Sequence, residues 1–168
     1  MYAAGQGLHF GIDLAARCGT QVVAIGDGVV AQVDNMGHGA GPHNLMIVHP
    51  NGYASFYGHL LQRPQLRVGQ QVLAGEVIAL SGDPDATCTS RPHLHLEIRD
   101  SATYRLAFNP MTLIDADWER IALAGGSPVV FEQDLSDPQR WQALLDQPTT
   151  HLGGPLVNDY SSAWPPVR

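Results

Sequence analysis

Residues 91–98 read RPHLHLEI, and from His93 onward polar and apolar side chains alternate. Successive side chains of an extended strand point to opposite faces, so this alternation predicts a strand over 93–98 with its leucines and isoleucine toward the core. The other face then carries His93, His95 and Glu97. Of two imidazoles about 7 Å apart on one strand face, one can bind a metal ion while the other contacts the space next to that ion. The alternative interpretation is that this face of the strand is polar only because it contacts solvent.

Several short stretches of β-branched and aromatic residues precede this strand, with turn residues between them. The pair Asn51-Gly52 lies between two of them and is typical of a hairpin turn. No helical 3.6-residue period occurs before residue 110, so we expect an all-β, antiparallel sheet with a groove. The predicted strands before 93–98 cover 22–25, 28–33, 45–48, 53–57, 71–73 and 77–80.

The character of the sequence changes near residue 111. Segments 115–124 and 137–145 each begin with an aspartate placed to cap a first helical turn, so we expect two short helices there. We therefore divide the chain into a β domain over 1–112 and an extension of short helices and loops over 113–168. The extension is expected to pack on the domain, and its function is open.

Composition excludes several classes of protein. The chain has 168 residues, a net charge of −7 and nine basic residues, all of them arginine. No apolar run approaches the roughly 20 residues of a membrane-spanning helix. Nucleic acid is excluded as a partner because no cluster of positive charge is present to neutralise phosphates. The absence of lysine excludes Schiff-base chemistry and carrier domains with a lysine-linked cofactor.

Two cysteines, Cys18 and Cys88, have no metal-binding or CxxC spacing. They are either two separate buried thiols or one disulfide between distant loops. We favour the disulfide, which indicates an oxidising compartment. The first residues lack the charged start and apolar stretch of a signal peptide, so the chain is either not secreted or a mature domain.

Further histidines occur in two short motifs. His9 and Asp13 are four residues apart, and the intervening Gly11-Ile12 argues against a helix, so both side chains fall on one face of an extended chain. His59 follows Tyr57-Gly58 at the end of a predicted strand. Four histidines carry a weaker signal. His38 and His43 flank a glycine-rich loop that either rims the groove or is a mobile surface loop. His49, in a turn, and His151, in the tail, are expected to be exposed.

These pieces together resemble the M23 family of zinc metallopeptidases, the lysostaphin- and LytM-like endopeptidases. The resemblance rests on HFGID at 9–13, YGHL at 57–60, VGQQVLAGEVIALSG at 68–82 and RPHLHLEI at 91–98, and it covers about residues 7–100. It implies the duplicated, barrel-sandwich-like β fold of that family. Departures from the family pattern are small: the two cysteines, and Ser90-Arg91 in place of the common Thr-Gly.

The resemblance also implies a site. It gives three ligands of one Zn²⁺, which are His9, Asp13 and His95. It gives two catalytic histidines, His59 and His93, whose roles as base, acid or oxyanion donor stay open. Glu97 either orients an imidazole from beyond the metal or forms an ion pair at the rim.

The implied function is a zinc endopeptidase that cleaves peptide cross-links of bacterial peptidoglycan, in a secreted or cell-envelope location. A soluble peptide substrate stays open, as do the cross-bridge and the oligomeric state. Two alternatives share the fold: a phosphotransferase IIA-like domain, which passes phosphate between histidines, and a non-catalytic scaffold. The HxH strand together with the YxH motif favours the peptidase.

Overall fold

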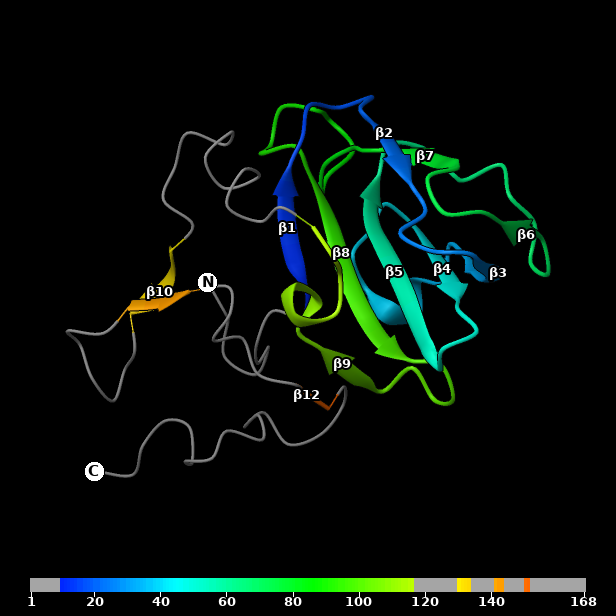
Figure 1. Ribbon diagram of the computed structural model, residues 1–168. Coiled ribbons are helices and arrows are strands. Elements are labelled where there is room, and N and C mark those ends of the chain that lie inside the picture. Colours follow the sequence, from blue (N-terminus) through cyan, green and yellow to red (C-terminus); the bar gives the residue numbers. More distant parts are fainter. Residues whose placement is uncertain (1–9, 117–129, 134–140, 144–149, 152–168) are drawn as a thin grey trace.

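The computed structural model describes residues 10–116, 130–133, 141–143 and 150–151 (Figure 1). An eight-stranded antiparallel sheet dominates this part of the chain. Seven of its strands follow the order β12-β9-β8-β5-β4-β3-β6, and β1 pairs with β8 beside them. The eight strands are β1 (Ile12–Ala15), β3 (Gly28–Val33), β4 (His43–Val48), β5 (Tyr53–Leu60), β6 (Gln71–Val72), β8 (His93–Asp100), β9 (Leu106–Phe108) and β12 (Thr150–His151).

Two small sheets and two short helical turns complete the described structure. The sheets pair β2 (Gln21–Val23) with β7 (Val77–Leu80), and β10 (Val130–Gln133) with β11 (Trp141–Ala143). The 3-10 turns are η1 (Met36–His38) and η2 (Pro110–Thr112). The prediction of an all-β, antiparallel fold is confirmed, and none of the described segments is an α-helix.

The main apolar core lies on one face of the large sheet. Leu45 and Ile47 from β4 and Tyr57 from β5 are fully buried there, and the β2–β7 pair contributes further apolar side chains. A smaller apolar cluster of Met46, Ala54 and Phe56 lies on the opposite face. Alternate residues of β4 and β5 thus serve two faces, as the period-two geometry of a strand requires.

Strand β8 is central to the arrangement. β5 pairs along one of its edges, while β1 and β9 pair one after the other along the opposite edge. The chain enters β1 so close to β8 that a Cβ at Gly11 would lie 2.2 Å from the carbonyl oxygen of Leu96. Glycine at position 11 is what allows this approach.

The structure corrects two expectations, and a third falls outside the described residues. Residues 141–143 form strand β11, so the predicted helix over 137–145 is wrong there; pairing with β10 overrides the local pattern. The predicted helix over 115–124 lies almost entirely outside the described residues. His49 is buried rather than exposed, because its ring is bonded to the carbonyl of Asp27 and the hydroxyl of Ser55.

Candidate metal centre and active site

The register of β1 on β8 brings Asp13 opposite His95. Directly paired residues in antiparallel strands project to the same face, and here the Asp13 Oδ1 and His95 Nδ1 atoms are 2.9 Å apart. His93, two residues earlier on the same face, places its Nε2 3.6 Å from the other oxygen of Asp13. The strand that carries HxH and the strand that carries the aspartate are therefore neighbours.

A second carboxylate lies on the far side of His95. Glu97 Oε1 is 2.8 Å from His95 Nε2, and the Glu97 side chain is buried, not at a rim. Burial alone would lower the pKa of His95, but the hydrogen bonds to Asp13 and Glu97 raise it to about 9. Burial alone would raise the pKa of Glu97, but the bond to His95 and the charges of His95 and Arg99 hold it below its ordinary value.

These groups suit a metal cation. Two carboxylates on either side of one imidazole favour a positive charge there, and a Zn²⁺ ion bound through Asp13 and His95 Nδ1 would replace the ring proton. The Glu97–His95 bond then has the usual geometry in which a carboxylate orients a zinc-ligating imidazole. Among the described residues no three such side chains converge on one metal position, and the third predicted ligand, His9, lies outside them.

His59 lies at the end of β5, next to the strand pair that aligns Gly58 with His95. Its backbone is left-handed, with φ 55°, and its N–H donates to the carbonyl of Ala40. Its Nδ1 donates to the carbonyl of Gly41, so in the neutral ring the Nε2 keeps its lone pair. Burial is the main cause that lowers the pKa of His59, and the nearby histidines add to it. The ring is therefore neutral near pH 7 and can accept a proton at Nε2.

His93 begins β8 and lies against His59, with ring centroids 4.7 Å apart. Its Nδ1 donates to the carbonyl of Arg91, so it too directs Nε2 away from that bond, toward Asp13. Gly82 fixes both backbones, because its N–H donates to His59 and its carbonyl accepts from His93. The two predicted catalytic histidines are thus adjacent and held by one residue between them.

These side chains line a cavity of about 610 Å³. Its walls come from β1, β8, the loop that follows β3 and the loop that precedes β8. The described lining residues are Phe10, Asp13, Ala15, His38, Ala40, His59, Pro84, Arg91, Pro92, His93, His95 and Glu97. The predicted groove is therefore present, and every predicted catalytic or metal-binding residue that the structure describes lines it.

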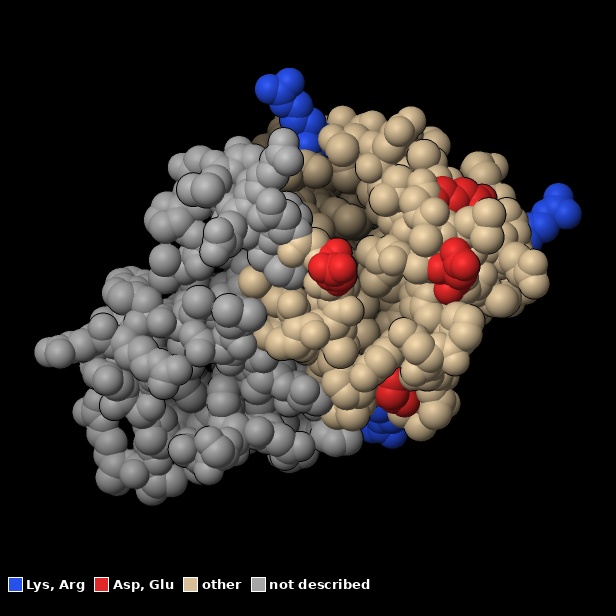
Figure 2. All heavy atoms as spheres, in the orientation of Figure 1, with Lys and Arg blue, Asp and Glu red and all other residues tan. Residues whose placement is uncertain are grey.

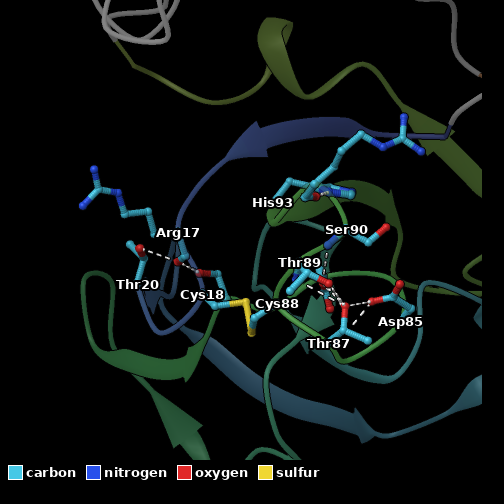
Figure 3. The surroundings of a disulfide bond; sticks show 12 residues. Arg17, Cys18, Thr20, Asp85, Thr87, Cys88, Thr89, Ser90 and His93 are labelled. Carbon is cyan, nitrogen blue, oxygen red and sulfur yellow. Dashed lines mark hydrogen bonds between the residues drawn. A yellow bond between two sulfur atoms is a disulfide. The ribbon is translucent and has the colours of Figure 1, made fainter.

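The two cysteines form a disulfide, as we favoured from the sequence. Figure 3 shows that it joins the loop after β1 to the loop before β8, beside a cluster of Asp85, Thr87 and Thr89 hydroxyl and carboxylate groups. Ser90 is held in the same loop by Asp83, whose Oδ2 accepts its N–H. The loop that leads into His93 is thus fastened both covalently and by hydrogen bonds.

Sequence reasoning missed one residue that contacts the site, Arg99, and the contact that His38 makes with it. Arg99 Nε is 2.6 Å from Glu97 Oε2, and its Nη1 is 2.6 Å from His38 Nδ1. The alternation that singled out 93, 95 and 97 continues to 99, so the pattern itself held the signal. His38 was assigned to the glycine-rich loop, but its contact with Arg99 spans 61 residues and has no local signature.

Charge on the visible face of the described part is sparse. Figure 2 shows acidic side chains lying singly and arginines projecting from the edges of that face. Within residues 10–116 and the shorter described segments, no helix has the length and apolar character to cross a membrane.

The geometry defines a class of site, one in which histidines and an aspartate of a β fold line the same groove. Comparison with known proteins places it: the profile of Peptidase family M23 matches residues 7–110, so the chain belongs to that family. The catalytic domain of the antimicrobial peptidase lysostaphin from Staphylococcus simulans superposes with a TM-score of 0.57 at 27% identity, over 67% of this chain and 83% of that one.

Curated relatives include both a protease and an activator by name. An uncharacterized metalloprotease of Haemophilus influenzae is 37% identical over 105 residues, which are 62% of this chain and 21% of the relative. The murein hydrolase activator NlpD of Escherichia coli is 39% identical over 102 residues, 58% of this chain and 24% of the relative. The matched region thus spans about a fifth to a quarter of these relatives.

Proposed function

We propose that this chain is a zinc-dependent endopeptidase that hydrolyses peptide bonds in the cross-links of bacterial peptidoglycan, in the cell envelope or outside the cell. The observation that carries the proposal is the convergence of Asp13, His95, His59 and His93 on one groove. Membership in Peptidase family M23 and the similarity to the lysostaphin peptidase support it. The disulfide between Cys18 and Cys88 supports an oxidising location.

In this proposal His9, Asp13 and His95 hold one Zn²⁺ ion. When bound, the ion supplies a Lewis acid that polarises a peptide carbonyl and makes water a nucleophile at neutral pH. Glu97 keeps the His95 ring oriented through the bond to Nε2. The ligand set of two imidazoles and one carboxylate is one that catalytic zinc sites use.

The proton transfers fall to the chain's own histidines. The lowered pKa of His59, caused first by its burial, leaves Nε2 free to take a proton at neutral pH. His93 stands 4.7 Å away between ring centroids, with Nδ1 committed to the carbonyl of Arg91. Its Nε2 is then the atom that exchanges a proton with, or donates a hydrogen bond to, the reacting group. Both rings thus commit Nδ1 to a backbone carbonyl and present Nε2 for proton transfer.

A second candidate function is activation of a separate wall hydrolase without catalysis. The relative named as a murein hydrolase activator, at 39% identity, favours it. Residue types favour the peptidase over the activator, because all five positions of the resemblance hold a residue able to bind zinc or move a proton: His9, Asp13, His59, His93 and His95.

The test is hydrolysis of purified peptidoglycan by the zinc-loaded chain, with released fragments identified by mass spectrometry. A peptidase gives fragments with a new amino and a new carboxyl end within the peptide. His59→Ala should retain zinc and lose turnover by about 100- to 10,000-fold, the usual contribution of a general base. Gln62→Ala, an exposed neighbour outside the groove, is the matched control and should behave as wild type.

Zinc-loaded wild type that releases no peptide fragments yet accelerates an added wall hydrolase would reject the peptidase and establish the activator. His59→Ala protein that cleaves at the wild-type rate would instead reject the catalytic role of His59.

A further inference from the structure

Arg99 is the most deeply buried arginine of the described structure, at 1% exposure. It lies on the same face of β8 as His95 and Glu97, two residues beyond the glutamate. Its guanidinium stacks on the ring of Phe56 at 4.7 Å and bonds to two side chains, Glu97 and His38. A buried charge persists only when it is paired and hydrogen-bonded, and this one is paired on two sides.

Through Glu97, Arg99 is connected to the candidate metal ligand His95. Glu97 uses Oε2 for Arg99 Nε and Oε1 for His95 Nε2, at 2.6 Å and 2.8 Å. One carboxylate thus bridges the guanidinium and the imidazole. Without Arg99, Glu97 would keep one partner and gain rotational freedom in a site that water does not reach. The guanidinium therefore fixes the carboxylate that fixes His95.

Through His38, Arg99 is connected to the loop that lines the groove. A guanidinium only donates, so His38 Nδ1 must accept, and the neutral ring carries its hydrogen on Nε2. Burial and then the charge of Arg99 lower the pKa of His38, which agrees with a neutral ring. His38 ends η1 and also packs edge-on against Phe56, with centroids 5.9 Å apart.

The loop that begins with His38 holds His59. The carbonyl of Ala40 accepts the backbone N–H of His59, and the carbonyl of Gly41 accepts from its Nδ1. The loop approaches β5 so closely that a Cβ at Gly58 would lie 2.4 Å from that of Ala40. An anchor at His38 is therefore two residues from the carbonyl that holds the backbone of His59 and three residues from the carbonyl that sets its ring tautomer.

We propose that Arg99 is a positioning residue for both halves of the active centre: through Glu97 it orients the zinc ligand His95, and through His38 it anchors the 38–41 loop that directs His59. The inference rests on the proposed metal centre and deepens it, since it assigns a role to two residues that touch neither metal nor substrate. A planar guanidinium suits the task, because its fork of donors serves two acceptors at fixed angles where lysine serves one.

The test compares zinc affinity, by competition with a chromophoric chelator, and turnover at saturating zinc in three variants. Arg99→Gln should bind zinc about 10- to 100-fold more weakly, the usual cost of losing a group that orients a ligand. Arg99→Lys retains a charge beside Glu97 and should bind zinc nearly as wild type, but it cannot also reach His38. Its kcat should fall about tenfold to 100-fold, as expected for a displaced catalytic group.

His38→Ala isolates the loop side. Zinc affinity should stay at the wild-type level while kcat falls as in Arg99→Lys, and the double variant His38→Ala/Arg99→Lys should be no slower than either. Arg67→Gln, at an exposed arginine away from the groove, is the matched control. Far-ultraviolet circular dichroism and thermal unfolding verify that each variant is folded. If Arg99→Gln does not fold, Arg99→Lys and His38→Ala still decide the proposal.

A second readout does not need turnover. Long-range ¹H–¹⁵N spectra of the imidazoles report which nitrogen of His59 carries hydrogen; wild type should show Nδ1–H, and His38→Ala should show a mixture. The inference is overturned by folded Arg99→Gln with wild-type zinc affinity, or by His38→Ala with both wild-type kcat and an unchanged His59 tautomer. Wild-type protein that binds zinc but cleaves no wall peptide would reject the proposed function alone, and the zinc and tautomer measurements would still test the inference.

Discussion

Both faces of the central sheet hold fully buried side chains, but only one of them buries charged groups. On one face, Leu45, Ile47 and Tyr57 are each 0% exposed and pack as an apolar core. On the other, Glu97 and Arg99 are 2% and 1% exposed, yet every charge has a partner. Removal from water stabilises the first face directly. On the second face it is offset by hydrogen bonds and strengthens the electrostatics around His95.

This difference assigns separate tasks to the faces. Strand β8 contributes to both, with Leu96 in the apolar core and His95 one residue away on the polar face. A change on the apolar face should alter stability and leave metal binding intact. A change on the polar face should alter metal binding at a smaller cost in stability.

The largest effect is expected from Ile47→Ala. Removing three carbons from this fully buried side chain should lower the free energy of unfolding by about 2–5 kcal/mol, because the lost burial and the resulting cavity add. Zinc stoichiometry of the folded fraction should not change. Urea unfolding and metal analysis of the same sample check both statements. Loss of zinc from well-folded Ile47→Ala protein would break the separation of the two faces.

Removal of the disulfide should have the next largest effect on stability. It closes a loop of 70 residues, and loss of that constraint on the unfolded chain corresponds to about 4 kcal/mol. The double variant Cys18→Ser/Cys88→Ser should therefore unfold at markedly lower urea concentration. Reduced wild-type protein is the control and should match the variant. A midpoint equal to that of oxidised wild type would mean that the bridge contributes nothing to stability.

Protonation of His95 on the polar face should make both the stability of the zinc-free protein and its zinc affinity depend on pH. The pKa of His95 is raised from 6.5 to about 9, so in zinc-free protein its proton stabilises the fold fully below pH 6.5, and that contribution is lost as pH rises through 9. Zinc must displace this proton, so zinc affinity should rise about tenfold per pH unit between pH 7 and 9. Chelator competition across that range measures the slope. A flat profile would show that His95 holds no proton there.

The smallest effect is expected at the far end of β8. Asp100 accepts hydrogen bonds from Thr103 and from the Leu106 N–H, and these bonds outweigh the slight burial and lower its pKa from 3.8 to about 2. Its stabilisation is present above pH 3.8 and is lost as pH falls through 2. After solvent screening it amounts to about 1 kcal/mol or less.

Asp100→Asn should accordingly be slightly less stable than wild type at pH 6 and indistinguishable from it near pH 2. Zinc affinity should be unaffected, since the turn lies away from the groove residues. Urea titrations at the two pH values supply the comparison, and an equal deficit at both would assign the effect to packing and not to charge.

Local pattern was sufficient to predict the sheet, whereas the roles of the site residues came from the resemblance to M23 peptidases. Alternation over 93–98 and the Asn51-Gly52 turn predict β8 and the β4–β5 hairpin, because strand geometry and turn type depend on neighbouring residues. The register Asp13–His95 was not predictable from spacing alone. The resemblance to M23 peptidases supplied that pairing.

Long-range contacts account for what was missed. The alternation of β8 left a solvated polar face as an alternative, but Phe56 and the loop at His38 cover that face, and neither lies near β8 in sequence. His49 was misjudged for the same reason, since its partner Ser55 belongs to the next strand. Strand β11 was taken for a helix because its pairing with β10 is a tertiary effect.

The central claim is that Asp13 and His95 are ligands in a zinc site on the polar face of β8. The most direct measurement is elemental analysis of purified wild type beside Asp13→Ala, each supplied with zinc and then freed of unbound metal. The account predicts about one zinc per wild-type chain and almost none in a folded Asp13→Ala chain. Equal zinc in the two proteins, or none in wild type, would contradict it.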